Sequence, residues 1–348
     1  MTPNEFYRRF VSAEKIKRYA FGTNEFADNI NLLAPLDGFI DDYTDHTTRQ
    51  GIPIIRLGDV EPHSLVVSCV TNSRPITALK KLQDAGIVHY IDYLSFSEAG
   101  NGSPRQIPVV TETRLDYQEH KEEYQKIRQM LADPESTHAF DSIMSLRLKG
   151  DLQSMKEFKY TPQQQYFEPF YEFTPEEVFV DGGGFDGATS KEFARRCPNY
   201  ASIHFFEPTN KSMEIAKKNL VNLQNIFYHQ VGLFNTADIL SFDTNSGSAC
   251  HISKTGNQTI RVNSLDDAVP SPVTFIKLDL EGAELYALEG MRNHIRRDHP
   301  KLAVSVYHSP SHLWEVPKLI LGVRTDYKIY LRHYTEGWAE TFMFFIPE

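Results

Sequence analysis

The sequence predicts an α/β protein with two Rossmann-like domains joined by a helical connector. Three observations support this prediction. Strand-like and helix-like segments alternate over residues 14–93 and again from residue 178 onward, which favours parallel sheets. A charged helical register separates these two stretches, over residues 112–150. The last two strand-like segments, 327–334 and 340–347, follow each other with no helix between them, so we expect a reversed final strand in the second sheet.

The first stretch predicts a small Rossmann-like α/β module over residues 1–110. Its apolar segments predict strands at 16–22, 37–42, 64–70 and 88–94. A helix is expected over 75–86, because Pro75 suits a first helical turn and Gly86 suits its end. In "YAFGTNEFADNI" Gly22 is the one glycine left of a nucleotide-binding loop, so a degenerate, structural or dimerising module is as good an interpretation as a binding one. We assign no ligand to it.

The second stretch predicts a domain over residues 166–348, preceded by a helical connector over 111–165. Breaks in the connector are expected at Pro134 and Gly150. In the second domain we expect strands at 177–183, 202–208, 226–233, 273–282, 301–308, 327–334 and 340–347. Helices are expected between them, at 185–197, 209–223, 283–297 and 312–320.

Composition narrows the class of protein. The chain of 348 residues is long enough for two domains with separate cores. A formal net charge of −10 argues against a general nucleic-acid binder, which needs clustered Lys and Arg. No apolar run predicts a membrane span or a signal peptide, and three isolated cysteines indicate neither a disulfide framework nor a CxxC metal site. We therefore expect a cytoplasmic protein. Its oligomeric state stays open, with a homo-oligomer as one alternative.

The segment "VFVDGGGFDGAT", residues 178–189, predicts a ligand-binding turn between a strand and a helix. It lacks the G-x-G-x-x-G spacing of a dinucleotide site, and no Gly-Lys-Ser/Thr follows to make a P-loop. Asp181 and Asp186 flank the glycines and would repel a phosphate. S-adenosylmethionine has a sulfonium, an ammonium and ribose hydroxyls but no phosphate, so the turn favours this cofactor.

Carboxylates at two further strand ends fit the same ligand. Glu207 ends the strand that follows the glycine turn, and an ionised carboxylate can accept two ribose hydroxyls. The alternative is that Glu207 caps the helix after Pro208. Asp279 ends the strand in "FIKLDLEGAE", at the sheet edge where open α/β folds bind ligands. Glu284 is instead expected to cap the next helix.

The order of these blocks, "VFVDGGGFDG…FFEP…VGL…VNSLDD…FIKLDLEGAE…LEG", resembles the FkbM family of S-adenosylmethionine-dependent methyltransferases. The resemblance covers about residues 165–348 and implies a class I methyltransferase fold and O-methylation of a sugar or other small hydroxyl compound. It implies cofactor contacts from Asp181, Gly182, Gly183, Gly184, Phe185, Asp186, Ser190, Glu207, Pro208, Gly232 and Asp279. The glycine turn would line the methionine end, Glu207 would hold the ribose, Gly232 would lie near the adenine, and Asp279 would face the reacting end.

The chain departs from the family in one place. Its loop reads DGGGFDG where the family commonly has D-x-G-A-N-x-G, which leaves the contact of Asp186 open. The first module resembles, more loosely, a module found before sugar-modifying enzymes, where it implies nucleotide or nucleotide-sugar binding.

Methyl transfer to a hydroxyl requires removal of a proton, for which histidine is well suited near neutral pH. His308 follows the strand 301–307 and is the first candidate for the base; His333 is the second, and Asp279 could act as base or orient a water. His251 lies in a Gly/Ser-rich segment and is expected to be solvated. A divalent ion on Asp279, Glu281 and His308 is conceivable, but their spacing is no recognised metal signature, so no metal is predicted.

Two alternatives remain open at this point. Tyr166 and Phe167 could close over the cofactor, or they could pack the domain junction. The leading function is methylation of a saccharide, a nucleotide sugar or a glycosylated precursor. The alternative is a catalytically inactive nucleotide-binding or scaffold protein that keeps the methyltransferase fold.

Overall fold

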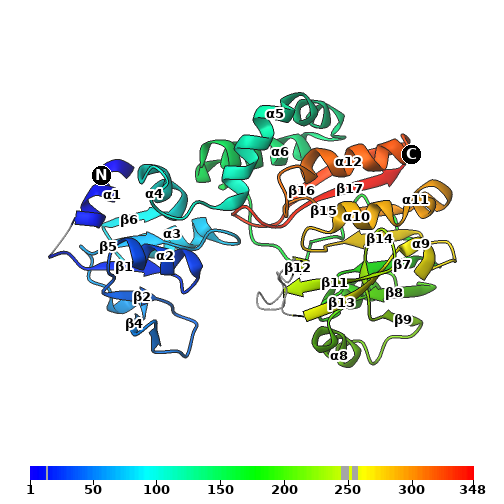
Figure 1. Cartoon of the computed structure of the whole chain (residues 1–348), viewed down its shortest axis with the longest axis horizontal. Helices are drawn as coiled ribbons and strands as arrows, with labels where there is room; N and C mark the ends of the chain where they lie inside the picture. The colour runs from blue at the N-terminus through cyan, green and yellow to red at the C-terminus, as the bar shows by residue number, and fades with distance from the viewer. Residues whose placement is uncertain (13–14, 244–250, 253–257) are drawn as a thin grey trace. The chain divides into compact units, whose positions relative to one another are not determined.

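The computed structural model describes residues 1–12, 15–243, 251–252 and 258–348 (Figure 1). The chain divides into two compact units, each built from separate stretches of sequence. Unit 1 contains residues 1–119, 140–162 and 333–340, and unit 2 contains residues 120–139, 163–332 and 341–348. No helix of the described part of the chain combines the length and the apolar character needed to cross a membrane.

Unit 1 contains a six-stranded sheet in the order β3-β4-β2-β1-β5-β6. Its strands are β1 (Arg18–Phe21), β2 (Gly38–Ile40), β3 (Thr48–Arg49), β4 (Ile52–Ile55), β5 (Leu65–Ser68) and β6 (His89–Asp92). All neighbours are parallel except β3, which is antiparallel to β4. Its helices are α1 (Pro3–Ser12), α2 (Glu25–Leu33), α3 (Pro75–Asp84) and α4 (Tyr93–Ala99). The four strands and the helix predicted in this region are all present.

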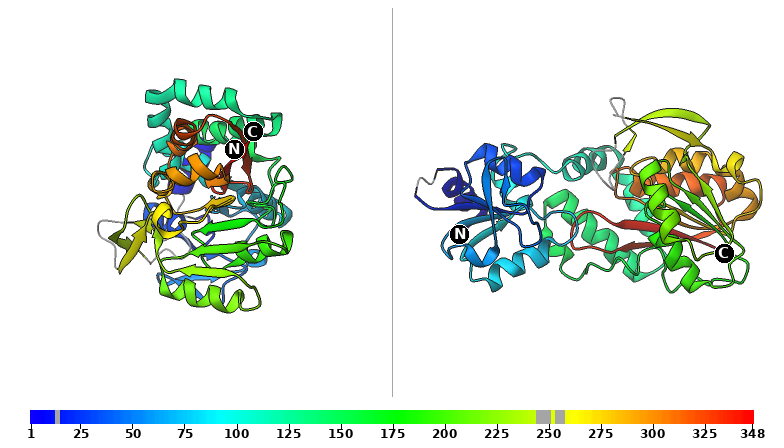
Figure 2. Two further views of the ribbon diagram at one scale, coloured as in Figure 1. Left: turned by 90° about the vertical axis from the view of Figure 1, so that its right-hand side faces the viewer. Right: turned by 90° about the horizontal axis from the view of Figure 1, so that it is seen from below.

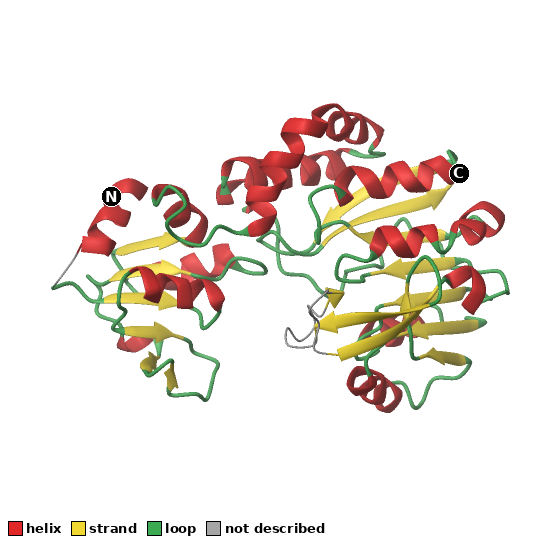
Figure 3. Cartoon of the chain, in the orientation of Figure 1, coloured by secondary structure: helices red, strands yellow, loops and turns green. Residues whose placement is uncertain are grey.

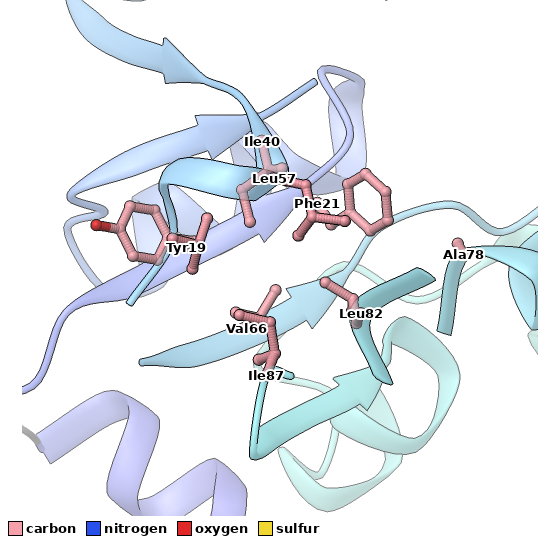
Figure 4. Close-up of a cluster of buried hydrophobic side chains, with 9 residues drawn as sticks. Tyr19, Phe21, Ile40, Leu57, Val66, Ala78, Leu82 and Ile87 are labelled. Carbon is pink, nitrogen blue, oxygen red and sulfur yellow. The ribbon is translucent and has the colours of Figure 1, made fainter. Parts of the chain in front are cut away.

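One hydrophobic cluster of unit 1 lies between this sheet and α3. Apolar side chains from β1, β2, β5 and α3 pack together there, as Figure 4 shows for Phe21, Ile40, Val66 and Leu82. Val66 and Leu82 are completely buried. Strands that are buried in this way explain the short, almost wholly apolar segments in the sequence.

The predicted helical register forms two long helices, α5 (Pro108–Met130) and α6 (Pro134–Lys149). A break in helical geometry at His120 divides α5, and the boundary between the two units falls next to it. Both predicted breaks are confirmed: α6 begins at Pro134 and is followed by Gly150, which has a φ of 67°.

Unit 2 contains a seven-stranded sheet in the order β16-β17-β15-β14-β7-β8-β9. Its strands are β7 (Val178–Gly182), β8 (Ser202–Phe206), β9 (Ile226–His229), β14 (Phe275–Leu278), β15 (Lys301–Ser305), β16 (Tyr327–His333) and β17 (Thr341–Pro347). Strands β15, β14, β7, β8 and β9 are parallel, and β17 is antiparallel to β15. The predicted reversed final strand is therefore confirmed.

Helices cover both faces of this sheet, as the red and yellow elements of Figure 3 and the two views of Figure 2 show. They are α7 (Ala188–Arg196), α8 (Asn210–Asn219), α9 (Leu265–Ala268), α10 (Glu284–Glu289), α11 (Arg292–Asp298) and α12 (His312–Val323). Helix α7 contacts α8, while α10 and α11 both contact α12. Because β7, β8 and β14 are parallel to one another, their carboxyl ends lie at the same edge of the sheet.

Two features of unit 2 differ from the sequence prediction. The segment 226–233 forms two strands, because β10 (Gly232–Leu233) leaves β9 and pairs with a second sheet in the order β10-β13-β11-β12. The other strands of that sheet are β11 (Asp238–Asp243), β12 (His251–Ile252) and β13 (Gln258–Asn263). The helix predicted at 283–297 is divided at Gly290, where a Cβ would lie 2.0 Å from the backbone oxygen of Phe234.

Candidate active site

The glycine-rich loop follows β7 and leads into α7, as predicted. Gly183 has a φ of 73°, and a Cβ at this position would lie 2.0 Å from the backbone oxygen of Asp279. A Cβ on Gly184 would lie 2.1 Å from the ring of Phe205. The loop therefore requires glycine because its backbone packs directly against the ends of β14 and β8. Phe185 follows with a half-exposed side chain and a φ of 49°.

Asp181 is completely buried and has a cation beside it. Lys277, on the neighbouring strand β14, places Nζ 3.2 Å from Asp181 Oδ1, and Ser190 donates a hydrogen bond of 2.7 Å to Asp181 Oδ2. The same ammonium donates to the backbone oxygens of Gly182 and Gly183. The sequence interpretation used the charge of Asp181 to exclude phosphate and named no partner for Asp181. In the structure Lys277 supplies its counter-charge, and both residues hold the glycine loop.

Glu207 makes the contacts expected of a helix cap and also reaches the glycine loop. Its Oε1 accepts hydrogen bonds from the backbone and hydroxyl of Thr209, directly before α8. Its Oε2 accepts from the backbone N–H of Phe185 at 3.2 Å. Burial raises the pKa of Glu207 above its ordinary value, although the hydrogen bonds from Thr209 and Phe185 oppose this. The carboxylate thus connects the ends of β7 and β8.

Three further residues predicted to contact the cofactor, Asp186, Pro208 and Gly232, follow the strands β7, β8 and β9. Asp186 accepts a hydrogen bond from the backbone of Ala188 in the first turn of α7. A Cβ on Gly232 would lie 3.8 Å from Pro208 and 3.3 Å from Val262. The structure therefore brings Pro208 and Gly232 together.

Asp279 lies at the end of β14, where two tyrosine hydroxyls bind its carboxylate. Tyr166 donates to Oδ2 at 2.7 Å and Tyr307 donates to Oδ1 at 3.3 Å. The ring of Tyr166 also packs edge-on against Phe342, with the ring centroids 4.8 Å apart. Tyr166 therefore packs within unit 2 and also reaches the side chain that we expected to be functional.

His308 emerges after β15 and faces the same carboxylate. Its Nε2 lies 3.7 Å from Asp279 Oδ1 and 3.2 Å from Glu281 Oε2, and its Nδ1 lies 2.9 Å from Glu284 Oε1. Burial alone would lower the pKa of His308, but the carboxylates of Glu284, Glu281 and Asp279 raise it well above its ordinary value.

Glu284 is the residue whose importance the sequence interpretation missed. It lies in the first turn of α10 as expected, but it does not cap the helix, because its Oε1 accepts from the backbone of Leu280, which precedes α10. The same completely buried carboxylate also accepts from Ser305 and contacts His308, and its Oε2 lies 3.4 Å from His312 Nδ1. Burial alone would raise the pKa of Glu284, but the two histidines lower it below its ordinary value. The signal in the sequence was the spacing of the two histidines in "YHSPSH".

His333, the second candidate for the base, belongs to unit 1 rather than to the unit that holds Asp279. It is buried, and its ring packs edge-on against Phe158 at 5.1 Å. Burial and the nearby Arg147 lower the pKa of His333 to about 3. The residue is neutral at pH 7, as a base must be, but it is not part of the cluster around His308. The side chain of His251 lies outside the described residues.

Comparison with known proteins identifies the domain that carries this cluster. Residues 181–334 match the family described as the methyltransferase FkbM domain. The chain carries an FkbM methyltransferase domain. The match begins at Asp181 and contains the glycine loop, Glu207, Asp279 and His308. It confirms the resemblance that the order of the sequence blocks indicated.

A solved structure shares the fold over nearly the whole chain. It is the methyltransferase FkbM from Methylobacillus flagellatus KT, with a TM-score of 0.77 and 21% identity over 99% of this chain and 92% of that chain. Aeropyrum pernix fibrillarin with natively bound S-adenosyl-L-methionine gives a TM-score of 0.34 at 12% identity, over 53% of this chain and 71% of that chain. A putative methyltransferase from Streptococcus mutans in complex with SAH gives a TM-score of 0.33 at 11% identity, over 49% of this chain and 88% of that chain. Comparison with curated proteins finds no match.

The family establishes the kind of reaction and the cofactor. An FkbM domain is an S-adenosylmethionine-dependent methyltransferase, so this chain is a methyltransferase that uses S-adenosylmethionine. The strand order of its seven-stranded sheet, with β17 reversed beside β15, is that of class I methyltransferases.

Proposed function

We propose that the FkbM domain transfers a methyl group to a hydroxyl oxygen of a saccharide, a nucleotide sugar or a glycosylated precursor. The observation that supports this most directly is the Asp279 carboxylate, which two tyrosine hydroxyls hold at the end of β14 beside the glycine loop. A fixed carboxylate is an acceptor-only group, suited to orienting a hydroxyl by its proton. The FkbM resemblance points to the same class of acceptor.

We propose the following arrangement of the cofactor along the strand ends. The glycine loop, held by Asp181 and Lys277, would lie against the methionine part, and Glu207 would exchange its bonds to Thr209 and Phe185 for the ribose hydroxyls. Pro208 and Gly232 would contact the adenine. The sulfonium would then face Asp279, beside which several further carboxylates lie. Favourable interaction between these carboxylates and a sulfonium supports this orientation.

The chemistry requires alignment and one proton transfer. The acceptor oxygen forms a bond to the methyl carbon while the carbon–sulfur bond breaks, and the sulfur keeps that electron pair as a thioether. The hydroxyl proton becomes strongly acidic as the oxygen bonds to carbon, so a carboxylate is a sufficient base late in the reaction. We assign this proton to Asp279, because two tyrosine hydroxyls hold its carboxylate in place at the end of β14.

Product formation with a panel of acceptors tests the proposal. The purified chain is incubated in a buffer containing Mg²⁺ with S-adenosylmethionine and with sugars, nucleotide sugars, amines and catechols, and S-adenosylhomocysteine and methylated product are measured. We expect turnover with a saccharide-type hydroxyl. Asp279→Asn should lower kcat by about 10²–10⁴-fold, the usual contribution of a positioned proton acceptor. The control is Asp238→Asn, which changes an exposed aspartate of the same unit.

Two other results would contradict the proposal. Turnover with amines alone would replace O-methylation by N-methylation. Binding of S-adenosylmethionine by calorimetry without turnover on any acceptor would support the alternative of an inactive binding protein. Glu207→Gln separates the cofactor site from the acceptor site, because it should weaken cofactor binding without changing which acceptor is used.

A further inference from the structure

We infer that Asp279, Glu284 and His308 form a binding site for one divalent cation of the Mn²⁺ and Mg²⁺ class. This inference deepens the proposed function and rests on it only for the role of the cation, since binding itself is independent of turnover. The sequence analysis considered Asp279, Glu281 and His308 instead and predicted no metal, because their spacing matches no known signature and Glu284 was assigned to a helix cap. The structure brings the three residues together from β14, α10 and the end of β15.

The first argument is the geometry of the donors. One ligand atom from each of the three residues lies within 4.8 Å of the others. The donors are one imidazole nitrogen and two carboxylate oxygens, and the Glu281 carboxylate lies 3.2 Å from His308 as a further oxygen donor. Carboxylates and water suit Mg²⁺ and Mn²⁺, whereas a structural zinc site is closed by four protein ligands, mostly cysteine and histidine.

The second argument is that buried polar atoms in the cluster lack hydrogen bonds. Glu284 is completely buried, and its Oε2 makes no hydrogen bond, although it lies 3.4 Å from His312 Nδ1. The Nε2 atom of His308 is also buried without a hydrogen bond, although it lies between Asp279 and Glu281. Buried polar atoms in proteins are normally paired, so two such atoms in one cluster call for a ligand.

The third argument is that the protein already fixes its donors. Tyr166 and Tyr307 hold the Asp279 carboxylate, while the backbone of Leu280 and the hydroxyl of Ser305 hold Glu284. Ligating carboxylates in metal sites are characteristically held by hydrogen bonds of this kind. The cluster is therefore preorganised for an ion at the sheet edge where the acceptor is proposed to bind.

A cation here would supply a specific piece of chemistry. Bound beside Asp279, it would take the acceptor oxygen as a ligand and increase the acidity of its hydroxyl. It would also balance the charge of the carboxylates around His308. Methyl transfer would then require the metal together with S-adenosylmethionine.

Electron paramagnetic resonance with Mn²⁺ tests the site directly. The full chain is titrated with Mn²⁺ in the presence of S-adenosylhomocysteine, and the loss of the free-ion signal gives the affinity and stoichiometry. We expect one Mn²⁺ per chain, displaced by Mg²⁺. Glu284→Gln and His308→Asn should each weaken binding by at least about tenfold. Glu289→Gln, an exposed glutamate of the same helix α10, is the matched control and should bind as the wild type does.

Several outcomes would overturn the inference. These are absence of Mn²⁺ binding by the folded wild-type chain at millimolar ion, binding that survives in both variants, or binding of Zn²⁺ alone. If Glu284→Gln fails to fold by circular dichroism, Asp279→Asn decides, because its side chain is partly exposed. Mn²⁺ binding without methylation of any acceptor contradicts the proposed function alone. Methylation that persists in EDTA, with no Mn²⁺ bound, contradicts this inference alone.

Discussion

Replacing Lys277 by Met should destabilise unit 2 and loosen the glycine loop. The side chains of Lys277 and Asp181 are 2% and 0% exposed, and their charged atoms lie 3.2 Å apart. The substitution removes the ammonium and leaves the Asp181 carboxylate buried with the Ser190 hydroxyl as its described hydrogen-bond donor. It also takes a donor away from the backbone oxygens of Gly182 and Gly183.

The magnitude follows from the burial of the pair. Removing one partner of a buried ion pair costs about 3–5 kcal/mol, because the remaining charge is left uncompensated in a medium of low polarity. The net contribution of the intact pair is smaller, since burying both charges is itself unfavourable. The double variant Asp181→Asn with Lys277→Met should therefore be more stable than the sum of the single changes predicts, by about 0.5–3 kcal/mol.

The two tryptophans allow each unit to be measured separately. Trp314 belongs to unit 2 and Trp338 to unit 1. In a Trp338→Phe background, tryptophan fluorescence during urea unfolding reports unit 2, and the midpoint and slope give its free energy of unfolding. Calorimetry with S-adenosylmethionine on the same proteins should show weaker binding when Lys277 is replaced, because the loop backbone loses its support.

Two results would refute this reasoning. One is a change in the free energy of unfolding for Lys277→Met that is no larger than the roughly 0.5 kcal/mol of a surface substitution. The control for a surface substitution is Lys191→Met, which replaces an exposed lysine of α7. The other is strict additivity in the double variant. Either would mean that Asp181 and Lys277 do not depend on each other, and that another group holds the glycine loop.

Three further predictions concern the glycine loop and unit 1. Gly183→Ala should lower the free energy of unfolding of unit 2 by about 1–3 kcal/mol because of the left-handed backbone at this position, and by more because the new Cβ would lie 2.0 Å from the backbone oxygen of Asp279. A variant as stable in urea as the wild type would contradict the described packing. Glu336→Ala should lower the free energy of unfolding of unit 1 by about 0.5–2 kcal/mol, because the carboxylate accepts a hydrogen bond from the backbone of Thr77 in the first turn of α3. An unchanged urea midpoint, measured by tryptophan fluorescence in a Trp314→Phe background, would exclude this role. Unit 1 should also lose stability as the pH falls below about 6.5, because His333 then binds a proton in the unfolded chain but not in the folded one, where its pKa is about 3. In a His333→Gln variant the free energy of unfolding of unit 1 should fall less steeply between pH 7 and pH 5. Equal slopes for the variant and the wild type would refute this assignment.

Much of the fold followed from local sequence patterns. Buried parallel strands such as Phe275–Leu278 are short, almost wholly apolar segments, and Pro134 and Gly150 bound a helix because of their backbone geometry. The reversed final strand followed from the absence of a helix between two apolar segments. Local patterns failed where a distant partner decides the structure: β10 leaves β9 because it pairs with β13, about 30 positions later in the chain.

The candidate site divides in the same way. By itself the sequence determined which residues stand at strand ends, and hence that the glycine loop, Glu207, Asp279 and His308 would meet at one edge of the sheet. Only the tertiary structure decided which charged groups lie beside them. It placed the Lys277 ammonium beside Asp181, three carboxylates against the His308 ring, and His333 in the other unit. The physical reason is that strand position depends on local periodicity, whereas the protonation of a buried group depends on neighbours brought close by folding.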